Sequence, residues 1–256
     1  MNVLDLFSGT GSISKVCDIL GWNVISVDLE LPATHECDIM DFDYKQYPKD
    51  YFSVIWASPP CTDYSSLKTC CYGRKLKDGS IYTKEQHIKD QDEADKLVLK
   101  SLEIIEYFKP ELWCMENPQT GNLKNREIVK GIPYYDVDYC MYSKWGYRKR
   151  TRIWTNKKDF NNLLCDGSGS CGNMIEIPTD GAKRHDTGKP LKCDTRKLHS
   201  NLLCKSETLR ALRKHRLTMG GNHGTDPNQL HVPGSGSDRL DRYRVPEDLI
   251  LSLFLD

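Results

Sequence analysis

The chain has 256 residues and a mass of 29.4 kDa, which is enough for one large domain or for one domain with a small appendage. Its 36 basic and 36 acidic residues cancel, so binding to a polyanion would have to come from local basic patches and not from a global field. It contains no apolar run of about 18 residues, the length of a membrane span, and its 11 irregularly spaced cysteines without a secretory leader favour a reducing, cytoplasmic location.

The first predicted element is a short apolar strand over residues 1–7 that runs into a glycine turn, residues 8–12 (Ser-Gly-Thr-Gly-Ser). An amphipathic helix follows from roughly Ile13 to Leu20. Glycines at such a turn let the backbone approach a ligand closely at a helix N-terminus. The third glycine of the dinucleotide pattern and the Lys-Ser/Thr pair of a phosphate loop are both missing, so a nucleoside without a pyrophosphate fits the turn better.

A second strand is predicted over residues 22–27 and ends at Asp28. An acidic side chain at the end of this strand conventionally holds ribose hydroxyls. The pair Asp38-Ile39 follows in a loop. An ordinary strand-helix-strand turn with a capping Asp is the alternative interpretation, which the sequence leaves open.

The apolar run 51–56 predicts a buried strand that ends at the turn Pro59-Pro60-Cys61. Two prolines cannot donate to a strand ladder, so the strand stops there and presents Cys61 at its carboxyl end. Open α/β sheets bind their ligands at that edge, which favours a chemical role for the thiol. A buried structural cysteine is the alternative.

Residues 67–95 are polar, charged and contain two glycines, which predicts a long exposed loop of the kind that forms a lid, leading into a helix from about Glu93 to Phe108. A further strand over residues 112–115 places Glu116 at the same sheet edge as Cys61. Beside a thiol, such a glutamate is a candidate acid or a binder of a ring nitrogen. A solvated or capping carboxylate is the alternative.

A strand rich in Tyr and Val is predicted over residues 133–142, and a basic aromatic stretch begins at Lys144. In strand geometry Arg148, Arg150 and Arg152 project from one face. Arginines interleaved with Trp and Tyr favour contacts with phosphates and bases. A solvated basic hairpin is the alternative.

The composition shifts to Gly, Ser, Cys, His and basic residues after residue 155, which predicts a small second domain over residues 156–241. The first domain would then comprise residues 1–155, completed by an amphipathic helix within residues 242–256. The spacing of four candidate zinc ligands matches no standard finger, so we expect no metal. These four residues are Cys165, Cys171, His185 and Cys193.

The motifs, taken in this order, resemble the cytosine-C5 DNA methyltransferase family, including its small phage- and virus-type members. Residues 5–11 (Asp-Leu-Phe-Ser-Gly-Thr-Gly) are similar to the family's first motif, and residues 59–61 to its Pro-Cys nucleophile loop. Residues 116–118 (Glu-Asn-Pro) are similar to its Glu-Asn-Val motif, and residues 146–154 to its Gln-x-Arg-x-Arg motif, with Arg148 where glutamine is usual. The resemblance covers residues 1–155 well and residues 242–256 loosely.

This resemblance implies an α/β, Rossmann-like class I S-adenosylmethionine-dependent methyltransferase fold with a small target-recognition domain. It implies a monomer that transfers a methyl group from S-adenosylmethionine to C5 of a cytosine flipped out of double-stranded DNA, with no membrane partner. Cys61 would add to C6 of the base, Glu116 would act at N3, and Arg152 with Arg150 would hold O2 and the active-site loop.

The resemblance and the patterns above also assign binding residues. The expected cofactor contacts are Phe7, Gly9, Thr10, Gly11, Asp28, Leu29, Asp38, Ile39 and Pro59. The expected nucleic-acid contacts are Ser65, Arg148, Arg210, Arg213, Lys214 and Arg216, of which the last four lie on a predicted helix over residues 209–217.

Two alternatives stay open from the sequence. The same residues could serve an RNA cytosine-C5 methyltransferase, and a catalytically silent nucleic-acid-binding homologue could keep the fold. An amino-nitrogen methyltransferase is disfavoured, because its Pro-Pro turn would be followed by an aromatic residue and Glu116 would have no role.

Overall fold

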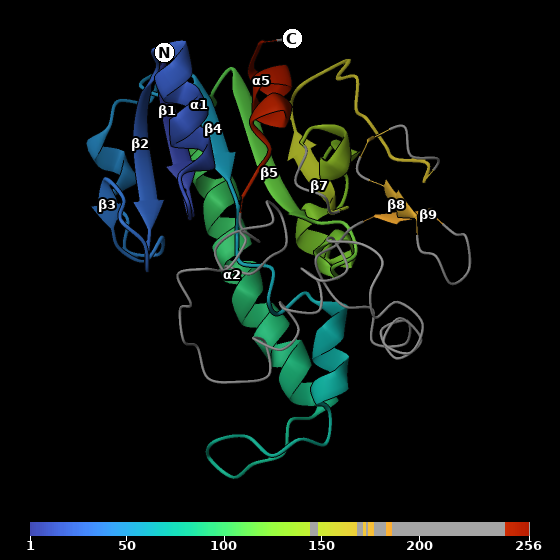
Figure 1. Ribbon diagram of the computed structural model, residues 1–256. Helices are drawn as coiled ribbons and strands as arrows, with labels where there is room; N and C mark the ends of the chain where they lie inside the picture. Colours follow the sequence, from blue (N-terminus) through green and yellow to red (C-terminus); the bar gives the residue numbers. More distant parts are fainter. Residues whose placement is uncertain (144–147, 168–170, 173, 177–182, 186–243, 256) are drawn as a thin grey trace, which may run out of the picture. The chain divides into compact units, whose positions relative to one another are not determined.

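The computed structural model describes residues 1–143, 148–167, 171–172, 174–176, 183–185 and 244–255 (Figure 1). The chain divides into two compact units. Unit 1 comprises Met1–Val137, Arg150–Asn162 and Val245–Asp256, and unit 2 comprises Asp138–Lys149 and Leu163–Arg244. Residues 138–149, which the sequence analysis placed in the first domain, therefore group with the second unit. The role of residues 156–241 in recognising the target stays a prediction.

A seven-stranded sheet forms the centre of unit 1, with the strand order β3-β2-β1-β4-β5-β7-β6. Strands β1 to β5 run parallel, and β7 runs antiparallel to β5. The order reverses between β1 and β4, which is the switch point at which doubly wound sheets bind ligands, and this topology confirms the Rossmann-like fold expected from the sequence. The strands are β1 Asn2–Leu6, β2 Asn23–Asp28, β3 His35–Glu36, β4 Val54–Ala57, β5 Leu112–Pro118, β6 Tyr134–Asp138 and β7 Arg150–Thr155.

Helices cover both faces of this sheet. Strand side chains alternate between the two faces, and Leu4, Leu6 and Ile55 join the core cluster that contains the apolar side of α2 (Lys84–Phe108). On the other face, α1 (Ser12–Leu20) packs against α5 (Glu247–Leu255), as Figure 1 shows.

The C-terminal segment is fixed to the first helix and its flanking residues. The Val245 N–H donates to Ser12 Oγ over 3.1 Å, and the rings of Trp22 and Phe254 stack with centroids 5.6 Å apart. Among the helices that the structure describes, none has the length and apolar character needed to cross a bilayer.

The helix α2 begins at Lys84, nine residues before the start expected from the sequence, so residues 84–95 are not part of a loop. Thr83 caps it by accepting a hydrogen bond from the Gln86 N–H at 3.2 Å. The buried positions of its first turns include His87, Gln91 and Asp95. These polar residues face inward at intervals of four, so the segment carries no hydrophobic period from which a helix could be recognised.

The segment between Cys61 and α2 has structure of its own. Residues Ser66–Cys71 form the 3₁₀ helix η2, and Lys75 and Ile81 form an antiparallel bridge. The segment between the N-cap of η2 and the N-cap of α2 is therefore residues 66–82, and the lid role expected for residues 67–95 stays a prediction.

The basic stretch also differs from the expected long strand. Strand β7 begins at Arg150, so Arg150 and Arg152 share one strand, whereas Arg148 precedes it and belongs to unit 2. The preceding strand β6 ends at Asp138, where the 3₁₀ helix η5 (Tyr139–Met141) begins. Unit 2 also contains the antiparallel pair β8 (Met174–Glu176) and β9 (Lys183–His185).

Candidate active site

The turn between β1 and α1 has an uncommon backbone geometry. Phe7, Gly9 and Gly11 have φ angles of 59°, 54° and 69°, and Gly11 is the N-cap of α1. Left-handed φ is costly for a non-glycine residue such as Phe7, so its surroundings must impose it. The first turn of α1 leaves backbone N–H groups without helical partners, and these groups suit polar or anionic atoms of a ligand.

Asp28 ties the end of β2 to this turn. Its Oδ2 accepts from the Gly9 N–H at 2.8 Å, while its Oδ1 accepts from the N–H groups of Glu30 at 3.0 Å and Leu31 at 2.9 Å. A carboxylate has about four acceptor positions. Asp28 therefore shapes the turn and retains acceptor capacity for the hydroxyl groups of a ligand.

Two buried polar atoms at this end of β1 have no hydrogen-bond partner among the described residues, namely Thr10 Oγ1 and Asp5 Oδ2. Buried polar atoms are nearly always satisfied, so such atoms indicate a missing partner. Asp5 is 1% exposed, and burial, with a smaller contribution from the charge of Asp28, raises the pKa of its carboxyl well above the ordinary range. The turn thus fits a polar ligand that reaches Thr10.

The remaining expected cofactor residues lie after β2. Leu29 is exposed, and the Cys37 N–H donates to the Asp28 carbonyl oxygen at 3.0 Å, which holds Asp38 close to the end of β2. Asp38 Oδ1 accepts from the Met40 N–H at 2.9 Å. Ile39 packs within the hydrophobic core cluster, so its buried side chain anchors the loop that contains Asp38.

Cys61 and Glu116 come to the same edge of the sheet on neighbouring strands. Strands β4 and β5 are parallel with Ala57 aligned to Met115, so Glu116 follows that pair directly and Cys61 lies four positions past Ala57. Cys61 is half-buried and Glu116 is buried. The structure therefore places both residues at the same edge of the sheet, and their catalytic roles stay predictions.

The turn that carries Cys61 is fixed to both neighbouring strands. The Asn117 side chain donates from Nδ2 to the carbonyl oxygen of Pro59 at 2.9 Å. The Ser58 N–H donates to the Leu6 carbonyl oxygen at 3.0 Å, and the Trp56 indole donates to Ser58 Oγ at 2.9 Å. Pro59, an expected cofactor contact, is itself buried in this turn.

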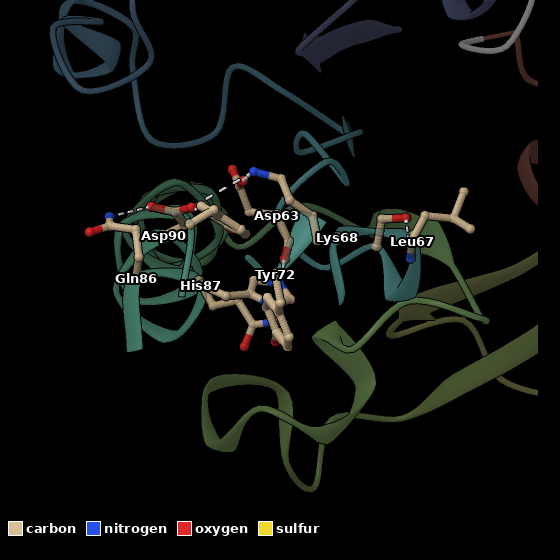
Figure 2. A network of polar contacts seen from close by, with 10 residues as sticks. Asp63, Leu67, Lys68, Tyr72, Gln86, His87 and Asp90 are labelled. Carbon is tan, nitrogen blue, oxygen red and sulfur yellow. Dashed lines mark hydrogen bonds and ion pairs between the residues drawn. The ribbon is translucent and has the colours of Figure 1, made fainter. Parts of the chain in front are cut away.

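Beyond Cys61, the chain is held by the first turns of α2 (Figure 2). His87 Nε2 lies 2.9 Å from the carbonyl oxygen of Asp63 and His87 Nδ1 lies 2.8 Å from the Tyr72 hydroxyl. Because a carbonyl can only accept, Nε2 donates to Asp63, and in the neutral ring Nδ1 is then the acceptor for the Tyr72 hydroxyl. The Asp63 carboxylate pairs with Lys68 at 2.7 Å.

A second set of contacts buries Tyr64. Its hydroxyl donates to Asp95 Oδ1 at 2.8 Å, and Arg126 donates from Nε to Asp95 Oδ2 at 2.8 Å. Burial, together with the Asp95 hydrogen bond and charge, raises the pKa of Tyr64. The Asn122 N–H donates to the Tyr64 carbonyl oxygen at 2.7 Å. These supporting residues were not identified from the sequence, and the spacing of His87, Gln91 and Asp95 was the available signal.

Ser65, an expected nucleic-acid contact, begins η2. Its Oγ accepts from the Leu67 N–H at 3.3 Å, which is an N-cap interaction. This contact orients the start of the 66–82 segment.

Arg152 lies opposite Asn117 in the β5–β7 pairing. Its Nε and one terminal nitrogen donate to the two carboxylate oxygens of Asp136 at 2.8 Å and 2.9 Å, and its guanidinium lies 3.5 Å from the centre of the Tyr134 ring. A bidentate, stacked arginine is held in one orientation. Arg150 is half-buried on the same strand.

Arg148, another expected nucleic-acid contact, has its hydrogen-bond partners in unit 2. Arg148 donates to Asp138 Oδ2 at 3.3 Å and to the Cys165 carbonyl oxygen at 3.0 Å, all within unit 2. The predicted helix with Arg210, Arg213, Lys214 and Arg216 lies outside the described residues, as does Cys193, and the structure describes no side chain for His185.

A cavity of about 640 Å³ lies at the other end of the strands. Its lining includes Ser53, directly before β4, and Glu111, directly before β5. No expected site residue lines it, so it is separate from the edge that carries Cys61.

Comparisons with known proteins place these motifs in context. No protein-family model matches the chain. A protein of Frog virus 3 (isolate Goorha) named "Probable DNA (cytosine-5)-methyltransferase" is 41% identical over 187 residues, which are 72% of this chain and 84% of that protein.

Two solved structures are also similar. The Entamoeba histolytica methyltransferase EhMeth is 16% identical with a TM-score of 0.45, and the match covers 64% of this chain and 55% of that chain. A prophage-encoded protein (E. coli) described as a candidate DNA modification methyltransferase is 18% identical with a TM-score of 0.42, and the match covers 65% of this chain and 49% of that chain. This chain thus spans about half the length of each solved structure.

Proposed function

This chain belongs to the DNA (cytosine-5)-methyltransferase family, and from that premise we propose that it transfers a methyl group from S-adenosylmethionine to C5 of cytosine in DNA. The observation that carries the proposal is the convergence at one sheet edge of the Asp28-bound glycine turn, the Cys61 turn and Glu116. A donor site next to a nucleophile and an acid is the arrangement that this reaction requires.

S-adenosylmethionine, when bound, would supply an electrophilic methyl group on a sulfonium centre. The residues at the carboxyl ends of β1 and β2 fit such a molecule. Thr10 Oγ1 is buried without a partner among the described residues, and Asp28 keeps acceptor positions for ribose hydroxyls. We assign cofactor binding to Phe7, Gly9, Thr10, Gly11 and Asp28, with Leu29 and Asp38 at the rim of the site.

The proposed nucleophile is the Cys61 thiolate. Cytosine C5 is a poor nucleophile, and addition of sulfur to C6 would turn the ring into an enamine. Its C5 could then attack the methyl carbon, with the neutral thioether of the methyl donor as the leaving group. The C5 proton is then lost to a base, the Sγ–C6 bond breaks, and the thiolate is restored. The fixed Pro-Pro turn serves this reaction by holding the sulfur in position.

Glu116 would donate a proton or a hydrogen bond to N3 as charge develops on the ring. Its place on β5 beside Asn117, which is hydrogen-bonded to Pro59, supports this role. Arg152 would act at O2 of the base or on the loop, and its bidentate contact with Asp136 supports a fixed orientation.

A base stacked in a duplex hides C6 from any thiol, so the target cytosine must be flipped out at a cost of a few kcal/mol. We assign closure over the flipped base to residues 66–82. This segment starts five residues after Cys61 and leads directly into the capped end of α2. Lid segments commonly exclude water from the reacting atoms.

A product assay tests the function. The purified chain is incubated with methyl-labelled S-adenosylmethionine and either double-stranded DNA or RNA, and the modified base is identified after digestion. Label in 5-methylcytosine from DNA is expected. Label only in RNA would replace the DNA substrate with an RNA substrate, and no label with either nucleic acid would support the silent homologue.

A further inference from the structure

Three cysteines of unit 2 converge although they are distant in sequence. Cys140 lies on η5, before β7, whereas Cys165 and Cys171 follow β7. Their three sulfur atoms all lie within 4.8 Å of one another, Cys140 and Cys165 are buried, and Cys171 is half-buried. The sequence analysis considered Cys165 and Cys171 as zinc ligands but did not consider Cys140.

This spacing is close to that of a thiolate metal site. Zinc binds cysteine sulfur at about 2.3 Å in a tetrahedron, so two sulfurs on one zinc are about 3.8 Å apart. Movements of the three sulfur atoms by roughly 1 Å or less would bring them to that separation. Three soft thiolates select zinc over magnesium or calcium.

The backbone around the cysteines is fixed by other contacts within unit 2. Asp138, which is fully buried, accepts from the Cys165 N–H at 2.9 Å and pairs with Arg148 at 3.3 Å. Arg148 also donates to the Cys165 carbonyl oxygen at 3.0 Å, and the Tyr142 hydroxyl accepts from the Leu163 N–H at 2.8 Å. Such outer contacts orient metal ligands in advance.

We propose that Cys140, Cys165 and Cys171 supply three of the four ligands of a structural zinc ion in unit 2 of this chain. The ion would join the segments on either side of β7, and its binding energy would contribute directly to the folding of unit 2.

Metal content tests the proposal in the full chain. The protein is purified under reducing conditions without chelator, and zinc is measured by mass spectrometry against protein concentration. We expect one zinc per chain in the wild type and a loss of most zinc in Cys140→Ser, Cys165→Ser and Cys171→Ser. Cys114→Ser is the matched control, because Cys114 is buried like Cys140 and Cys165 but lies on β5 in unit 1. Retention of zinc by all three unit 2 variants would overturn the assignment.

A second measurement avoids the risk that a variant fails to fold. Wild-type protein is stripped with a chelator and titrated with Co²⁺ alone, and the thiolate-to-cobalt charge-transfer absorption is recorded. We expect this band to appear and to be abolished by added Zn²⁺. A wild-type chain that contains no zinc and gives no band would overturn the proposal.

Discussion

Asn117 donates from its side-chain Nδ2 to the main-chain carbonyl oxygen of Pro59, over 2.9 Å and with both residues buried. The contact joins the strand that carries Glu116 to the turn that carries Cys61. The thiol and the carboxyl are therefore positioned by one rigid connection and not by two independent loops. Catalytic groups held in this way lose little entropy when the substrate is bound.

Replacement of Cys61 by Ala should abolish a covalent complex with DNA that contains 5-fluorocytosine. Fluorine at C5 cannot leave as a proton does, so the elimination that releases the thiol is blocked and the adduct accumulates. The complex is detected on a denaturing gel with S-adenosylmethionine present. Cys70→Ala is the control, because Cys70 is an exposed cysteine of η2, and it should keep the adduct. A denaturation-resistant complex in the Cys61 variant would refute the assignment.

Substitution of Glu116 by Gln should lower turnover by roughly 10²- to 10⁴-fold, because it removes a proton donor and a charge that act in the transition state. S-adenosylmethionine affinity should be unchanged, because the residues assigned to cofactor binding lie at the carboxyl ends of β1 and β2 and not on β5. Single-turnover methylation and calorimetry measure the two quantities. Glu111→Gln, at an exposed position before β5, should leave both unchanged. A Glu116 variant with near wild-type turnover would make this carboxyl a structural residue only.

Asp28→Ala should weaken S-adenosylmethionine binding by roughly 10- to 100-fold, since a hydrogen bond to a charged group contributes about 1.5–3 kcal/mol. The variant loses both the ribose acceptor and the contact that fixes Gly9. Isothermal titration calorimetry measures the change. In Glu30→Gln the backbone N–H that donates to Asp28 is kept, so its affinity should match the wild type. If Asp28→Ala bound S-adenosylmethionine as tightly as Glu30→Gln does, the cofactor site would have to lie elsewhere in the protein.

Asp95→Ala should lower the free energy of unfolding by about 3 kcal/mol, because it leaves the Arg126 charge and the Tyr64 hydroxyl without their buried partner. Denaturant titration measures this loss. Asp92→Ala removes the other carboxylate paired with Arg126, but that side chain is 57% exposed, so its cost should stay under about 1 kcal/mol. If the two variants lose equal stability, the Tyr64 contact does not hold the loop after Cys61.

Asp5→Asn should reduce the dependence of stability on pH. The pKa of Asp5 is raised in the folded state, so folding favours the protonated carboxyl. Its contribution to stability is complete below the pKa of the unfolded chain, about 3.9. That contribution is lost as pH rises through the pKa of the folded state. The wild type should therefore lose stability relative to the variant as pH rises above about 3.9. Thermal unfolding across this range measures the difference. Asp18→Asn makes the same change of charge at an exposed position, so it should keep the wild-type dependence of stability on pH. An Asp5→Asn variant that also kept this dependence would contradict the prediction.

The parts of the fold that could be predicted are those in which apolar runs meet glycine or proline. Glycine allows the backbone of the turn at Gly9 and Gly11, and proline ends the strand before Pro59. The ends of these strands, and the candidate residues beside them, could therefore be predicted from residues close by in the sequence. Cys61 and Glu116 could be placed on one edge because parallel strands end on the same side.

The remaining features depend on contacts between distant residues. The start of α2 was missed because His87, Gln91 and Asp95 are buried by hydrogen bonds to the loop after Cys61, and polar burial leaves no hydrophobic period. Cys140 was not connected with Cys165 because no local pattern relates two cysteines on opposite sides of a strand. The partner of Arg152, Asp136, became evident only from the pairing at the sheet edge.

The antiparallel strand β7 also has a consequence for amide exchange with solvent. Met115 is paired with Ala57 on one side and with Trp154 on the other, directly before Glu116. Amides in such a doubly paired strand open only with the global unfolding of the sheet, whereas those of exposed loops open locally. Glu116 would then directly follow slowly exchanging residues of β5, and Cys61 would border a faster segment, residues 66–82. A nucleic acid that closes this segment should slow exchange there and leave β5 unchanged.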